Sequence, residues 1–175
     1  MDFPVRKKLP HTIPQWVAEG SWFFITINCV PPGNNQLCHA GTGDAVLAAM
    51  KFNHDKLVWH CRLCLLMPDH LHAILAFPRE PGMQTSIKNW KKYVAGKQGV
   101  DWQRDFFDHR LRNHHELEEK TLYILMNPVR KVSANGRRIG YGFTVRKTDH
   151  RLCSGRARHS VPAAGLNHQP WRAED

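Results

Sequence analysis

Hydrophobic positions in the first 130 residues fall into two patterns. Some runs are rich in aromatic and β-branched residues, such as Trp22-Phe-Phe-Ile-Thr-Ile-Asn28, and these are typical of strands. Other runs repeat apolar residues every three or four positions, as at Ile87, Trp90 and Val94, which is typical of a helix with one buried side. The patterns predict strands at 22–28, 57–67, 70–77 and 106–111, and helices at 44–52, 84–97 and 113–127.

Local residue types indicate where several elements begin and end. Asp44 is placed to cap the first helix, and Asn113 and Glu116 have the spacing of a capping box. Pro128 is expected to end the last helix. The break at Pro68-Asp69 is so short that the strands on either side of it form a hairpin.

The predicted order of elements is β-α-β-β-α-β-α. Hairpins and helical crossovers in this order give an antiparallel sheet with helices on one face. We therefore expect an α+β, ferredoxin-like (RRM-like) domain over residues 1–130. Residues 131–175 are rich in Gly, Arg, His and Pro without clear periodicity, and we expect them to form a basic, irregular tail.

The formal net charge is +10, which favours a polyanionic partner because Lys and Arg at phosphates release counterions. Much of this charge is in the tail, since residues 128–175 hold ten Lys/Arg and three Asp/Glu. The apolar runs are too short to cross a bilayer, and the first residues lack a secretory pattern. We expect a cytoplasmic protein.

The five cysteines are expected to be small buried or half-buried residues. Cys61 and Cys64 have zinc-like spacing, but no second pair follows them. In a strand, positions three apart point to opposite faces, which argues against a shared metal. A structural zinc site remains the minor alternative.

His70 and His72 are the central candidate for chemistry. Residues two apart in a strand share a face, so both imidazoles point the same way and suit a divalent metal. With 12 histidines in the chain, such a pair also arises by chance. Tyr123 and Asn127 are four apart on the last predicted helix, so they lie on one helical line. They face the metal only if that helix packs on the same sheet face. The alternative is that Tyr123 packs and Asn127 ends the helix.

Four blocks resemble a known family in the same order along the chain. Met67-Pro-Asp-His-Leu-His72 resembles the His-hydrophobe-His motif of HUH single-tyrosine transposases, the insertion-sequence-200-like class. The blocks Gly20–Thr26, Asp105–Leu111 and Tyr123–Val129 are similar to blocks of the REP-associated tyrosine transposases.

The resemblance implies a ferredoxin-like fold, a Mg²⁺ or Mn²⁺ cofactor, and single-stranded DNA with hairpins (REP/BIME-like palindromes) as substrate. By position, His70 and His72 match the metal-binding pair, Tyr123 matches the nucleophile, and Asn127 matches the residue that completes the metal site. A tyrosine nucleophile would give a 5′-phosphotyrosine and a free 3′-hydroxyl, which allows resealing without ATP. The resemblance also implies a bacterial, nucleoid-associated protein that is a monomer or a homodimer.

Five basic residues are candidates for DNA binding. Lys88, Lys91 and Lys92, near Trp90, could form a stacking and phosphate-binding surface, although any amphipathic helix gives this pattern. Arg110 and Arg112 could meet phosphates or be solvent-facing charges on an edge strand.

Two other tyrosines and one histidine are further candidates for a functional role. Tyr93 is expected to pack in the core beside Trp90, and Tyr141 is expected in a loop of the tail. His109 could approach DNA or bond to Asp108.

After Val129 the family pattern stops. A frameshifted C-terminus and a basic arm that holds DNA both explain the tail. Three functions remain open: a transposase, a non-catalytic nucleic-acid-binding module with a vestigial metal site, and a metal-dependent hydrolase in which Tyr123 is structural.

Overall fold

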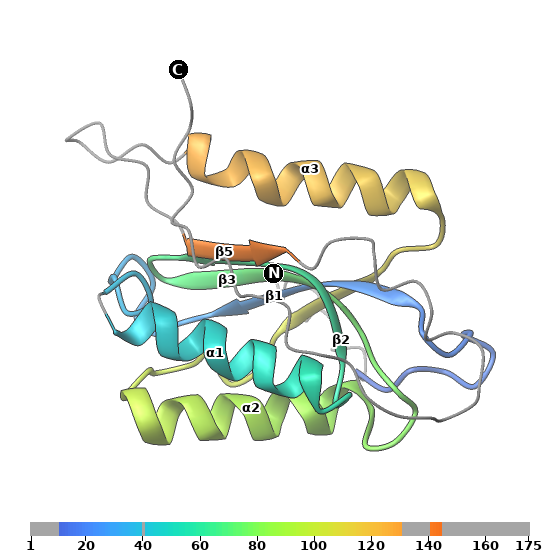
Figure 1. Ribbon diagram of the computed structural model, residues 1–175, viewed down its shortest axis with the longest axis horizontal. Helices are drawn as coiled ribbons and strands as arrows, with labels where there is room; N and C mark the ends of the chain where they lie inside the picture. The colour runs from blue at the N-terminus through green and yellow to red at the C-terminus, as the bar shows by residue number, and fades with distance from the viewer. Residues whose placement is uncertain (1–10, 40, 131–140, 145–175) are drawn as a thin grey trace, which may run out of the picture.

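A computed structural model describes residues 11–39, 41–130 and 141–144 of the chain (Figure 1). Its elements follow the predicted order, with one more strand at the end. They are β1 (Trp22–Asn28), α1 (Thr42–Asp55), β2 (His60–Met67), β3 (His70–Ala76), α2 (Gly82–Gln98), β4 (Phe107–Arg110), α3 (His114–Arg130) and β5 (Tyr141–Thr144).

The strands form one antiparallel sheet in the order β4-β1-β3-β2-β5. The first four strands are therefore ordered 4-1-3-2, which is the arrangement that a split β-α-β repeat produces. The predicted α+β, ferredoxin-like fold is confirmed.

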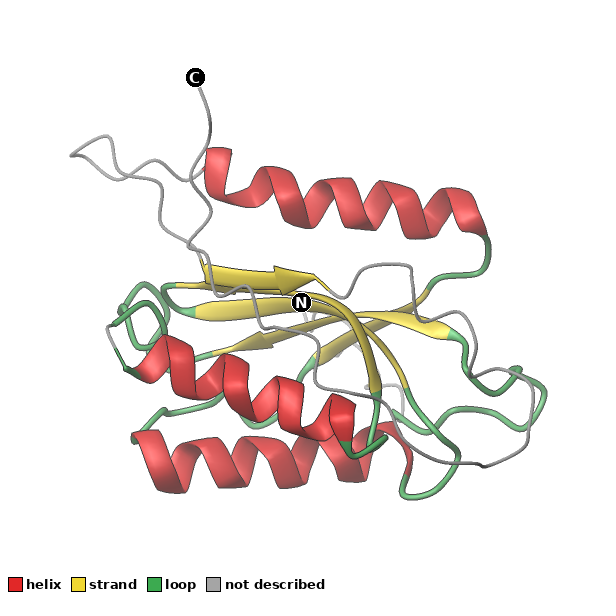
Figure 2. Cartoon of the chain, in the orientation of Figure 1, coloured by secondary structure: helices red, strands yellow, loops and turns green. Residues whose placement is uncertain are grey.

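Helices cover both faces of the sheet (Figure 2). The prediction placed the helices on one face; α1 and α2 do lie together on one face, but α3 lies on the other. The reason is that the central strands are apolar on both sides: Phe23 and Ile25 belong to the core under α1 and α2, whereas Phe24 packs with Leu117 and Ile124 of α3. A sheet with two apolar faces needs cover on both.

Part of the predicted tail belongs to the sheet. β5 pairs with β2, with Leu63 opposite Thr144 and Leu66 opposite Tyr141. The prediction that Tyr141 lies in a loop was wrong, because the outer edge of β2 offers unpaired backbone groups to a short strand. The remainder of the tail, including Cys153, lies outside the described residues.

Several predicted element ends also shifted. α1 starts at Thr42 after Gly41, whose φ of 88° suits glycine, so Asp44 lies inside the helix and does not cap it. β2 starts only at His60, because Leu57 has a positive φ of 57°. α3 continues past Pro128 to Arg130.

The predicted cap of α3 is present. The backbone N–H of Glu116 donates to Oδ1 of Asn113 at 2.9 Å. The Glu116 carboxylate accepts from the N–H of Arg112 at 2.9 Å, one residue earlier than in the usual capping box.

The cysteines in the described part of the chain are free thiols, buried at positions 29, 61 and 64 and half-buried at 38. Cys61 and Cys64 both lie in the core under α1 and α2, so the prediction of opposite faces was wrong. A register shift between Cys61 and Leu63 adds a residue to β2 and turns both thiols to the same side. Burial raises the pKa of Cys29, Cys38 and Cys64 to about 12.

Within the described ranges, no helix combines the length and the apolar character needed to cross a membrane.

Candidate active site

His70 and His72 lie on the α3 face of β3, at the strand end that follows the hairpin turn. Their ring centres are 4.8 Å apart. Leu71, between them, is fully buried on the other face in the core under α1 and α2. The predicted same-face arrangement of the two imidazoles follows directly from strand geometry.

A hydrogen bond to the Nδ1 atom orients each imidazole. Nδ1 of His70 lies 2.7 Å from Oδ1 of Asp69, and because a carboxylate only accepts, Nδ1 is the donor. The other carboxylate oxygen of Asp69 accepts from the N–H of Gly33 at 2.7 Å, which fixes the carboxylate. The proton on Nδ1 of His70 leaves the lone pair on Nε2, as in metal-binding histidines.

Thr26 orients the imidazole of His72. It lies directly opposite His72 in the ladder between β1 and β3, and its Oγ1 is 2.9 Å from Nδ1 of His72. The ring of Phe24 stacks on His72, with centres 5.4 Å apart and planes at 25°. His72 is therefore held both by a hydrogen bond and by a packed ring.

α3 brings Tyr123 to these histidines. The ring centres of Tyr123 and His72 are 5.7 Å apart, and Tyr123 also meets the edge of Phe24 at 5.8 Å. Ile124, the next residue, is fully buried against the sheet. Tyr123 keeps 39% of its surface exposed, so a large substrate can reach it.

Asn127 continues along the same side of α3 toward His70. The helix starts near Trp22, whose carbonyl accepts from the N–H of Leu111, and runs toward the opposite end of β1 and β3 (Figure 1). Four helical residues advance about 6 Å, close to the rise of two strand residues. Asn127 is only 8% exposed, and its Nδ2 atom has no hydrogen-bond partner in the described residues.

These side chains fit a divalent ion. Among the described residues, no group of three or more His, Cys, Asp and Glu side chains is placed to hold a metal. The donor set would instead be the imidazoles of His70 and His72 with the amide oxygen of Asn127. The Asn127 amide is buried, and an amide oxygen is a ligand type that Mg²⁺ and Mn²⁺ accept. Three protein donors leave coordination positions for water or a phosphate oxygen.

The three lysines predicted to bind DNA lie on α2, with the sheet between them and Tyr123. Lys88 and Lys92 are exposed. Lys91 is only 9% exposed, and its ammonium donates to the backbone carbonyls of residues 103, 104 and 105. Burial lowers the pKa of Lys91, and the carboxylate of Asp105 partly offsets this effect. Lys91 therefore supports the loop before β4, and its assignment to phosphate binding was wrong.

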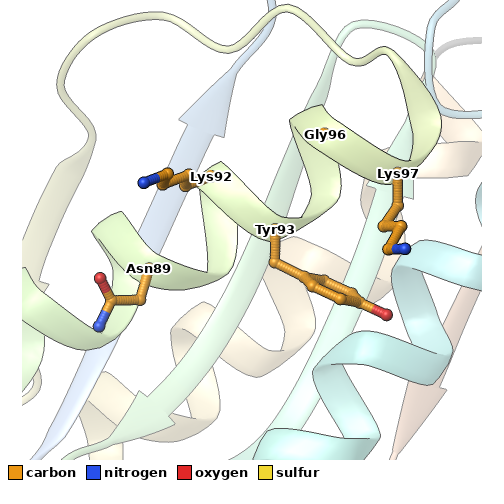
Figure 3. A pocket seen from close by; sticks show the side chains of 5 residues that line it. All are labelled: Asn89, Lys92, Tyr93, Gly96 and Lys97. Carbon is orange, nitrogen blue, oxygen red and sulfur yellow. The ribbon is translucent and has the colours of Figure 1, made fainter.

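A shallow hollow on α2 includes Lys92 and is shown in Figure 3. Its lining residues are Asn89, Lys92, Tyr93, Gly96 and Lys97. Tyr93 projects from the outer side of α2, so the prediction that it packs in the core was wrong. The helix turns Trp90 and Val94 inward, and Tyr93 falls outside that buried stripe.

The arginines near β4 occupy different surroundings. Arg110 is opposite Phe23, which points to the α2 side of the sheet, and its guanidinium lies 4.8 Å from the ring centre of Trp16. Arg112 is exposed just before α3.

The contacts of His109 on β4 also differ from the prediction. Asp108 pairs with His11, so the alternative of a bond between His109 and Asp108 was wrong; neighbouring strand residues point to opposite faces. His109 instead lies 3.9 Å from the carboxylate of Glu116.

Sequence reasoning missed Thr26, Asp69 and Lys120 as neighbours of the site. Thr26 and Asp69 both fall inside the blocks that resemble the family, so their positions were marked, but their partners were not. The Lys120 ammonium lies 5.7 Å from the Tyr123 ring centre.

No family model matches the sequence, and no curated protein is detectably similar to it. Solved structures do resemble it. One of these is a REP-associated tyrosine transposase bound to a REP hairpin, with a TM-score of 0.56 and 20% identity over 67% of this chain and 72% of that chain. The chain has the fold of a REP-associated tyrosine transposase. A transposase candidate from Deinococcus radiodurans R1 overlaps 64% of this chain and 93% of its own, with a TM-score of 0.45 and 14% identity.

Proposed function

We propose that this protein is a metal-dependent endonuclease and strand transferase of the transposase class that acts on single-stranded DNA near hairpins. The observation that carries the proposal is the contact of Tyr123 with His72, with the buried Asn127 one helical turn after Tyr123. The fold of a transposase that was solved with a REP hairpin supports hairpin DNA as the substrate class.

Tyr123 is the proposed nucleophile. Its phenolic oxygen forms a bond to the scissile phosphorus, the bond from phosphorus to the 3′ oxygen breaks, and the phenol proton is lost to solvent. The 3′ oxygen takes up a proton and leaves as a hydroxyl, while the 5′ end stays on Tyr123 as a phosphotyrosine. Attack by a 3′-hydroxyl on this linkage reseals DNA with no external energy source, because the number of phosphodiester bonds is conserved.

His70, His72 and Asn127 would hold Mg²⁺ or Mn²⁺. When bound, such an ion polarises the phosphate and stabilises the charge that develops on it. Asp69 and Thr26 keep the two imidazoles in place before substrate arrives, so little reorganisation is needed when the phosphate binds.

The test is covalent trapping. Wild-type protein is incubated with Mn²⁺ and a labelled single-stranded oligonucleotide that carries a hairpin, and the adduct is resolved on a denaturing gel. Tyr123→Phe should abolish both adduct and cleavage while DNA affinity stays within about twofold. Tyr93→Phe is the matched control, because Tyr93 is an exposed helical tyrosine on the other side of the sheet, and it should react like wild type.

The same experiment separates the alternatives. Cleavage by Tyr123→Phe would overturn the tyrosine mechanism in favour of a metal-dependent hydrolase. Hairpin binding with no cleavage by wild type would favour the non-catalytic binding module. Gel filtration with and without DNA distinguishes a monomer from a homodimer.

A further inference from the structure

An aromatic ring at the open edge of the sheet continues the row of rings that starts at the nucleophile. Phe107 of β4 meets Phe24 edge-on, with ring centres 6.3 Å apart and planes at 69°. Phe24 in turn meets Tyr123 at 5.8 Å. Phe24 is buried, whereas Phe107 is 55% exposed, so Phe107 is accessible at the far end of this row from Tyr123.

Strand pairing places Phe107 on the same face as the site. Phe107 is directly opposite Thr26 in the ladder between β1 and β4, so the two side chains share a face. Thr26 is also the residue that contacts His72. β4 is the end strand of the sheet, and the ring of Phe107 therefore lies between the metal-binding histidines and the outer edge.

Positive charge lies over the same rings. The Lys120 ammonium is 5.9 Å from the ring centre of Phe24 and 5.7 Å from that of Tyr123. Its ion pair with Glu119, at 3.4 Å, is on the surface and contributes little, so it does not prevent Lys120 from meeting an anion. His109 projects from the same face of β4, opposite Phe24.

We propose that Phe107 and Lys120 form a nucleotide subsite beside Tyr123. Phe107 stacks on the base of a nucleotide next to the scissile phosphate, and Lys120 contacts a phosphate of the same strand. This inference rests on the proposed function for the identity of the substrate. An aromatic face next to an ammonium matches the alternation of base and phosphate along single-stranded DNA, whereas an apolar protein partner would bring nothing to balance the charge.

The two residues fulfil separate roles, which makes separate tests possible. Stacking of one base on an aromatic ring is worth roughly 1–3 kcal/mol, or about 5- to 150-fold in affinity. One phosphate contact changes the slope of log affinity against log salt by about 0.7 for a single strand.

The chain offers a matched control pair on its opposite side. Phe52 on α1 is 60% exposed, and the ammonium of Lys56 lies 5.8 Å from its ring centre. The ring of Phe52 is about as exposed as that of Phe107 and also has a lysine nearby, but it lies on the α1 side of the sheet, away from Tyr123.

The experiment measures binding of single-stranded hairpin oligonucleotides that carry 2-aminopurine at successive positions, in EDTA so that no cleavage occurs. Phe107→Ala and Phe107→Leu should each weaken binding at least about fivefold and remove fluorescence quenching at one position, whereas Phe107→Tyr should retain both. Lys120→Gln should reduce the salt slope by about 0.7. Phe52→Ala and Lys56→Gln should behave like wild type.

Circular dichroism and thermal melting confirm that each variant is folded. Unchanged affinity and quenching in folded Phe107→Leu, or equal losses in Phe52→Ala, would overturn the subsite. The readout needs neither metal nor cleavage. A protein that stacks the base at Phe107 but forms no adduct with Mn²⁺ would therefore overturn the proposed function and leave the subsite intact. Normal adduct formation by a protein that shows no stacking at Phe107 would overturn the subsite and leave the proposed function intact.

Discussion

The ring centre of Tyr123 lies 5.7 Å from that of His72, although one residue is on α3 and the other on β3. Phe24 contacts both rings, and the buried Ile124 holds α3 against the sheet beside them. The proposed nucleophile and a proposed metal-binding histidine are thus brought together by packing of a helix on a strand. Two predictions below concern residues around this pair, and two concern the layer on the other side of the sheet.

Asp69→Asn should weaken Mn²⁺ binding by about 10- to 100-fold, because loss of the carboxylate frees the His70 ring and lowers its basicity. Isothermal titration with Mn²⁺ measures the change. Asp55→Asn removes an exposed carboxylate that pairs with Lys51 and should leave Mn²⁺ affinity unchanged. Wild-type affinity in folded Asp69→Asn would exclude this orienting role.

Asn127→Leu should separate stability from activity. The substitution replaces a buried amide with an apolar group of similar size and removes an unpaired N–H donor, so the free energy of unfolding should stay within about 1 kcal/mol of wild type or increase. Adduct formation with Mn²⁺ should fall by at least about tenfold, because one metal donor is lost. Urea denaturation and the trapping assay give the two values. Full activity in this variant would show that Asn127 holds no metal.

Lys91→Met should lower stability without changing the electrostatics of DNA binding. Three backbone carbonyls lose their donor, which should cost about 1–3 kcal/mol in urea denaturation. The salt dependence of single-stranded DNA affinity should not change. Arg112→Gln is the comparison: if this exposed residue meets a phosphate, its loss reduces the salt slope by about 0.7. A reduced slope in Lys91→Met would restore its assignment to phosphate binding.

The buried thiols should resist alkylation in the native protein. Burial raises the pKa of Cys29 and Cys64 from 9.0 to about 12, and a nearby Asp69 adds to this effect at Cys29. At pH 8 the reactive thiolate fraction then falls roughly 1,000-fold, in addition to the loss of access. Iodoacetamide labelling followed by peptide mass spectrometry should show slow modification at both positions, and rapid modification in guanidinium. Rapid labelling of the native protein would show that β2 or the segment after β1 opens.

Much of the site could be predicted from local sequence because its parts follow local rules. A strand places His70 and His72 on one face by its two-residue period, and a helix stacks Asn127 one turn after Tyr123 by its 3.6-residue period. The cap at Asn113 and Glu116 is likewise a short-range feature, and the structure has it where the spacing indicates. Each of these relationships involves residues within four positions of one another.

The predictions that were wrong depended on contacts between distant segments or on a local irregularity of a strand. A single inserted residue in β2 reversed the expected faces of Cys61 and Cys64. Lys91 has the pattern of a surface lysine, and only the loop that folds over α2 supplies the carbonyls that bury it. β5 is too short to be recognised alone and is stabilised by the free edge of β2.

The sequence by itself determined the order of the first seven elements, the antiparallel fold and two pairs of candidate residues, because hydrophobic period and residue type act over a few positions. The tertiary structure alone decided that Tyr123 meets His72. That outcome required α3 to pack on the face of the sheet opposite α1 and α2, and the choice of face depends on how the apolar surfaces of all the strands are shared between the two layers.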